Sequence, residues 1–147
     1  MYRKILVAVD NTKADDSLLP HITRLAKMLD SKILLVHVAN GWAARNFEQL
    51  QLTESEEMKG DKAYLEKVAA RLREQGVQVT CLLAMGNPPD QILKAAGLEG
   101  CDLIALTTHG HRFVGDLIYG STIEKVRHCS QVPLLIVRAT DLGANPL

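Results

Sequence analysis

Residues 2–38, YRKILVAVDNTKADDSLLPHITRLAKMLDSKILLVHV, hold two short apolar runs on either side of a longer amphipathic stretch. The runs at 2–10 and 32–38 are rich in Val, Ile and Leu, which is typical of strands buried on both faces. Between them, 15–30 places Leu and Ile on one stripe of a helix, and Pro20 falls in its first turns, where a missing amide is best tolerated. This order predicts two parallel strands joined by a right-handed crossover.

The same alternation continues to the end of the chain. It predicts helices at 54–76, 89–100 and 121–130, and strands at 77–85, 101–108 and 132–139. The whole pattern predicts one α/β domain, doubly wound and Rossmann-like, with a five-stranded parallel sheet in the order 3-2-1-4-5 and helices on both faces. We expect this domain to span 1–140, followed by a C-terminal tail at 141–147. The segment 39–53 is long for a connector and would be either a lid or a surface excursion.

Composition excludes several classes of partner. The chain has 147 residues, with 17 Lys and Arg against 17 Asp and Glu, so no general electrostatic attraction to nucleic acid or to an anionic membrane is expected. No apolar run reaches the roughly 18 residues of a membrane helix, and no targeting segment precedes the first predicted strand. Cys81, Cys101 and Cys129 lack CxxC spacing, which indicates a reduced, cytoplasmic protein without structural zinc.

A glycine-containing stretch, THGHRFVGDLIYGST (108–122), follows the fourth predicted strand. In open parallel sheets ligands bind beyond the carboxyl ends of the strands, so this stretch leaves the sheet at the favoured place. Ser121 and Thr122, as the first residues of a helix, would offer free amides to an anion. The stretch therefore predicts a phosphate cradle.

The same residues also fit an ordinary helix cap. In that interpretation Ser121 is the cap and Glu124 completes a capping box. The two interpretations are compatible, because a cap and an anion use the same amides.

Three segments resemble one family, in order and along almost the whole chain: ILVAVD (5–10), GNPPDQILKAA (86–96) and THGHRFVGDLIYGSTIEKVRHCSQVPLLIV (108–137). They are similar to the universal stress protein family. The signature of its ATP-binding branch is Gly, two residues, Gly, nine residues, Gly, then Ser or Thr. Gly110, Gly120 and Ser121 match this frame, and Thr107 stands where the first glycine would be.

The resemblance implies that the chain binds ATP, with Mg²⁺ or Mn²⁺ at the phosphates, and it implies a set of nucleotide-binding residues. These are Ala8, Val9, Asp10, Val38, Thr107, His109, Gly110, Arg112, Gly120, Ser121 and Thr122. Other interpretations stay open for some of them. The apolar strand residues also fit a core, Asp10 fits an Asx turn, and His111 and Arg112 fit a solvated loop.

Two further features have structural interpretations. His37, inside an apolar run, is typical of a core histidine whose polar atoms are satisfied. The GNPP turn at 86–89 would close the third strand, with Pro89 as the first residue of the next helix. No histidine has a demonstrable carboxylate partner in the sequence, so we assign no general base or other catalytic residue and name no metal ligands.

The functional hypothesis is a regulatory, nucleotide-dependent stress-response factor with little or no ATPase activity. One alternative is a structural homodimer of the same fold that binds no nucleotide. Another is an enzyme that activates a substrate with ATP, for which 147 residues leave little room. A homodimer is expected through the fifth strand (132–139), because this apolar strand would lie at a sheet edge and because the family commonly dimerises there.

Overall fold

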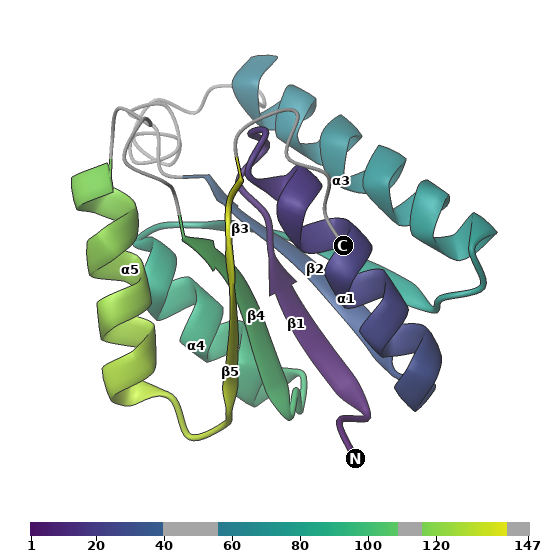
Figure 1. Ribbon diagram of the computed structural model, residues 1–147. Helices are drawn as coiled ribbons and strands as arrows, with labels where there is room; N and C mark the ends of the chain where they lie inside the picture. Colours follow the sequence, from purple (N-terminus) through teal and green to yellow (C-terminus); the bar gives the residue numbers. More distant parts are fainter. Residues whose placement is uncertain (40–55, 109–115, 141–147) are drawn as a thin grey trace.

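The computed structural model describes residues 1–39, 56–108 and 116–140. Strands and helices alternate through these residues (Figure 1): β1 (Lys4–Ala8), α1 (Asp15–Leu29), β2 (Lys32–Ala39), α3 (Glu56–Glu74), β3 (Val79–Met85), α4 (Pro88–Leu98), β4 (Leu103–Thr108), α5 (Asp116–Cys129) and β5 (Leu134–Arg138). Residues 40–53 of the predicted excursion and the tail at 141–147 lie outside the described residues.

The five strands form one sheet in the order β3-β2-β1-β4-β5, and every neighbouring pair is parallel. Ile5 of β1 pairs with Ile33 of β2 on one side and with Leu103 of β4 on the other. The fold class and the strand order are therefore as the sequence predicts. The chain runs outward from β1 to β3, and then crosses back over the sheet to β4 and β5.

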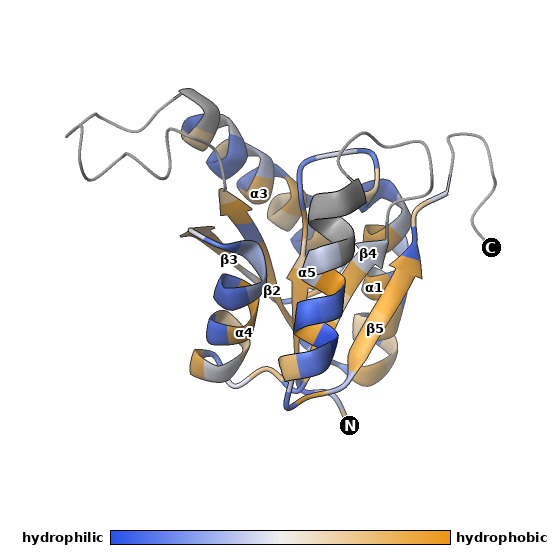
Figure 2. Cartoon of the chain, turned by 90° about the vertical axis from the view of Figure 1, so that its left-hand side faces the viewer, coloured by the Kyte–Doolittle hydropathy of each residue, from blue (hydrophilic) through white to orange (hydrophobic). Residues whose placement is uncertain are grey.

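The central strand shows why both faces of the sheet need helices. Ile5 and Val7 belong to a core that they share with α1 and α3, whereas Leu6, between them, belongs to a second core shared with α4 and α5. All three side chains are fully buried. In Figure 2 the strands carry the hydrophobic colours and lie between helices with polar outer surfaces. A strand that is buried on both faces needs a continuous apolar run, as found in β1.

One predicted boundary is wrong. The last helix begins at Asp116, not at Ser121, so Ser121 neither caps it nor forms a capping box with Glu124. A glycine inside a helix costs only about 1 kcal/mol relative to alanine, which a packed helix can absorb, so Gly120 does not stop the helix.

The other boundaries agree with the prediction to within a few residues. The helix α4 starts at Pro88, so Pro89 is its second residue and not its first. No helix in the described ranges is long and apolar enough to cross a membrane.

Candidate functional site

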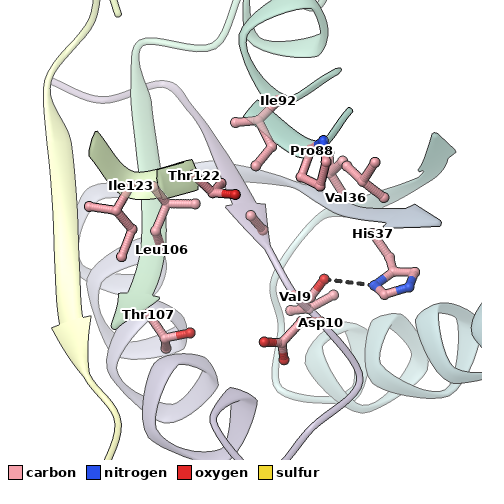
Figure 3. Close-up of a pocket in the computed structure, with 12 residues that line it drawn as sticks. Val9, Asp10, Val36, His37, Pro88, Ile92, Leu106, Thr107, Thr122 and Ile123 are labelled. Atoms are coloured by element: carbon pink, nitrogen blue, oxygen red, sulfur yellow. Dashed lines mark hydrogen bonds between the residues drawn. The ribbon is translucent and has the colours of Figure 1, made fainter. Parts of the chain in front are cut away.

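A pocket opens at the carboxyl ends of β1, β2 and β4, beside the first turn of α4 and the middle of α5 (Figure 3). The strand order reverses between β1 and β4, which makes this edge the topological switch point of the sheet. Figure 3 shows Pro88 and Ile92 of α4 on one side of the β1 end, and Leu106 and Ile123 on the other. The two sides form an apolar slot.

Several residues that the sequence predicts for a nucleotide site line this pocket: Ala8, Val9, Asp10, Val38, Thr107 and Thr122. The structure therefore brings together side chains from β1, β2, β4 and α5 that are far apart in the sequence. His109, Gly110 and Arg112 lie outside the described residues. Gly120 lies inside α5, and Ser121 is exposed on that helix and does not line the pocket.

Sequence reasoning did not assign the other lining residues to the site: Val36, His37, Pro88, Ile92, Leu106 and Ile123. Strand periodicity could have found Val36, because it lies two residues before Val38 on the same face of β2. Helix periodicity could have found Ile92, which lies four residues after Pro88. No sequence signal shows that His37, in an apolar strand, also reaches the pocket.

The turn after β1 is built around the buried carboxylate of Asp15, the first residue of α1. The amide of Asp10 donates to its Oδ1 at 3.1 Å, and the amide of Asn11 donates to its Oδ2 at 2.9 Å. Asn11 has a φ of 60°, a left-handed conformation that Asn tolerates better than most residues. Asp10 in turn accepts the hydroxyl of Thr12 at 2.6 Å, so its carboxylate belongs to the local turn as well as to the pocket lining.

The environment of Asp15 favours its protonated form. Burial, together with the negative charge of nearby Asp10, raises the pKa of Asp15 to about 7. A hydrogen bond from Tyr64 opposes this shift, and burial and the same bond raise the pKa of the Tyr64 phenol. A carboxyl group that can change its proton near neutral pH therefore lies under the turn that carries Asp10.

His37 is satisfied at both ring nitrogens, as expected of a core histidine. Its Nδ1 lies 2.9 Å from the carbonyl oxygen of Val9, and its Nε2 lies 3.2 Å from Oδ2 of Asp61 on α3. Asn11 donates to the other oxygen of Asp61 at 3.3 Å. Neither nitrogen is available to take a proton from a ligand, so His37 is not a general base in this structure.

Because α5 starts before Ser121, the amides of Ser121 and Thr122 are not the free helix-end amides on which the predicted phosphate cradle was based. Only the first four amides of a helix lack a partner inside it, and the amides of Ser121 and Thr122 come after those. The side chain of Thr122 is 7% exposed and points toward the pocket (Figure 3). Thr122 therefore reaches the site through its side chain and not through a helix-end amide.

Acidic, cysteine and histidine side chains do not gather into a metal site within the described ranges, where no three of them could hold an ion together. Asp10 is the carboxylate that lines the pocket. A divalent ion there would need ligands in addition to the Asp10 carboxylate.

Comparisons with known proteins agree with the geometry. A model of the universal stress protein family matches residues 1–138. The universal stress protein MJ0577 of Methanocaldococcus jannaschii is 27% identical, over 94% of this chain and 96% of its own length. The universal stress protein YxiE of Bacillus subtilis is also 27% identical, over 94% of this chain and 100% of its own.

Solved structures share the fold. The structure of MJ0577 superposes with a TM-score of 0.76 at 26% identity, over 96% of this chain and 99% of that one. A universal stress protein in complex with cAMP gives a TM-score of 0.69 at 17% identity, over 95% of this chain and 98% of its own. A universal stress protein from Archaeoglobus fulgidus in complex with dAMP gives a TM-score of 0.69 at 19% identity. The match covers 92% of this chain and 98% of that one.

Proposed function

The chain belongs to the universal stress protein family, and on this premise we propose that it binds an adenine nucleotide, ATP, in the pocket at the carboxyl ends of β1, β2 and β4. One observation carries the proposal: the pocket lies at the switch point of the sheet and is an apolar slot with few polar groups. Aliphatic side chains of Ile92, Leu106 and Ile123 suit the faces of a planar base. The polar groups that remain, including Asp10 and Thr122, suit a sugar or a phosphate.

Two proteins of the same fold support the choice of an adenine nucleotide. One was solved in complex with cAMP and the other with dAMP, and both ligands carry an adenine ring. Both proteins are less than 20% identical to this chain, so adenine is proposed as the base bound by this chain and is not carried over from them.

The phosphates would extend from the slot past Thr122 toward the segment that links β4 to α5. Gly110, Gly120 and Ser121 fit the spacing of the ATP-binding branch, and His109 and Arg112 could add donors to phosphate oxygens. Mg²⁺ or Mn²⁺ would be held mainly by the phosphate oxygens, and Asp10 is the carboxylate that lines the pocket among the described residues.

The role that fits this site is regulation through nucleotide occupancy, with little or no hydrolysis. Phosphoryl transfer requires a positioned water and cationic groups around the γ-phosphate. His37, which reaches the pocket, has both ring nitrogens engaged. The alternative remains a homodimeric protein of this fold that binds no nucleotide, with Thr107 in place of the first signature glycine as the feature in its favour.

Calorimetry with ATP and Mg²⁺ would test the proposal, with GTP as the comparison. The side chain of Ala8 faces the α4 and α5 side of the sheet and lines the pocket, so Ala8→Met should fill the slot and abolish binding. Ala70→Met, on the exposed surface of α3, is the matched control and should bind as the wild type does. Saturable binding that Ala8→Met leaves unchanged would place the nucleotide elsewhere, and no binding by the wild type would favour the alternative.

A further inference from the structure

The ladder between β1 and β2 ends unusually at the pocket. Ala8 pairs with Val36, and the amide of Val9 donates to the carbonyl of Val36 at 2.9 Å. In a regular parallel ladder the next bond would run from the amide of Val38 to the carbonyl of Val9. Among the backbone hydrogen bonds of the described residues that bond does not occur. The Val9 carbonyl instead faces Nδ1 of His37 at 2.9 Å, the contact drawn in Figure 3.

His37 is held in this position from behind. Its side chain and that of Asp61 are each 11% exposed, and Nε2 lies 3.2 Å from Oδ2 of Asp61. A carbonyl oxygen only accepts hydrogen bonds, so Nδ1 carries a proton. Asn11 donates to the other oxygen of Asp61, so a series of polar contacts runs from Asn11 through Asp61 and His37 to the carbonyl of Val9.

We propose that His37 is a positioning residue for the base: it holds the Val9 carbonyl out of the ladder and so leaves the amide of Val38 as a hydrogen-bond donor at the pocket. This deepens the proposed function and rests on it. The proposal has a consequence for selectivity. A donor at this edge fits the unprotonated ring nitrogen N1 of adenine, whereas hypoxanthine and guanine carry a hydrogen on N1 and would meet it donor to donor.

The first test needs no nucleotide. In the double variant His37→Leu/Asp61→Ala, no ring nitrogen competes for the Val9 carbonyl, and no buried carboxylate is left without its partner. The ladder bond should then close, and exchange of the Val38 amide with solvent, followed by NMR, should slow by at least about tenfold. Asp61→Asn is the conservative control. Its amide can donate to Nε2 and still accept from Asn11, so Val38 should exchange as in the wild type.

The second test compares ATP with inosine triphosphate, which differs from ATP at the 6-position and in the hydrogen on N1. The wild type and Asp61→Asn should prefer ATP by at least about tenfold, and the double variant should lose most of that preference. If the double variant does not fold, the single variant Asp61→Ala takes its place. Without Asp61 the ring of His37 can turn away from the Val9 carbonyl, so the same loss of preference is expected. A Val38 amide as protected in the wild type as in the variants would overturn this inference even if ATP binds. Failure of the wild type to bind ATP would overturn the proposed function, and the role of His37 with it.

Discussion

The hydroxyl of Tyr64 on α3 donates to Oδ2 of Asp15, the first residue of α1, at a distance of 2.6 Å. Asp15 is fully buried, so this bond ties two helices together directly beneath the turn that carries Asp10 and Asn11. The acceptor has a pKa raised to about 7, chiefly by burial and then by the charge of Asp10. The contact between α1 and α3 and the turn at Asp10 and Asn11 therefore both depend on the titrating carboxyl group of Asp15.

Asp15 should make the protein less stable as pH rises from about 4 to about 7. The unfolded chain loses this proton near pH 4, whereas the folded protein keeps it until about pH 7, so the stabilisation is complete below pH 4 and is lost by pH 7. It amounts to at most about 4 kcal/mol. Asp15→Asn should remove this slope. Urea unfolding across the pH range would measure it, with the exposed Asp16→Asn as the control. A difference in stability between the wild type and Asp15→Asn that does not change with pH would show that folding does not raise the pKa of Asp15.

The fold could be predicted because each buried strand is a continuous apolar run, as in Ile5–Val7, and each run except the last is followed by a helical stripe. The start of α5 could not, because Gly120 followed by Ser121 and Thr122 reads as a helix start, and only packing decides that the helix continues through them.

The candidate site was predicted in part for a similar reason. Asp10 and Thr107 were found because they come at the carboxyl ends of strands, which meet at one edge of the sheet. His37 was not, because its role depends on Asp61, which lies 24 positions later and reaches it only in the folded chain. Such a contact leaves no periodic trace in a single sequence.

Any hydrolysis of ATP should be slow. The nucleotide-binding residues predicted from the sequence include no assigned general base, and the ring of His37 is engaged at both nitrogens. Phosphate release should therefore stay well below the roughly 10 per second typical of enzymes. A coupled phosphate assay would measure it, with the pocket-filling Ala8→Met as the control for contaminating activity. A fast, Mg²⁺-dependent rate that Ala8→Met abolishes would assign the protein to the enzymes.

The three cysteines should differ in reactivity. Cys129 is exposed at the end of α5, whereas burial raises the pKa of both Cys81 and Cys101. Because the thiolate is the nucleophile, one thiol per chain should react with a disulfide reagent at least about tenfold faster than the other two. Cys129→Ser should remove that fast phase. If the fast phase persists in Cys129→Ser, Cys81 or Cys101 is accessible in solution.

The last prediction concerns β5, which among the described strands pairs with β4 alone and forms an edge of the sheet. Figure 2 shows this strand in hydrophobic colours along the open edge, and Ile136 is 40% exposed there. A bare apolar edge promotes uncontrolled pairing, and Pro133 blocks only its beginning. We therefore expect two copies to pair antiparallel through β5 about a two-fold axis, which uses the same surface twice and closes the edge.

Light scattering after gel filtration should show a dimer. Ile136→Lys should give a folded monomer, or one prone to aggregate, because the axis brings two like charges together. Met28→Lys replaces a side chain that is 82% exposed on α1, and it should leave the dimer intact. A wild type that stays monomeric at high concentration would mean that something other than a second β5 covers the edge.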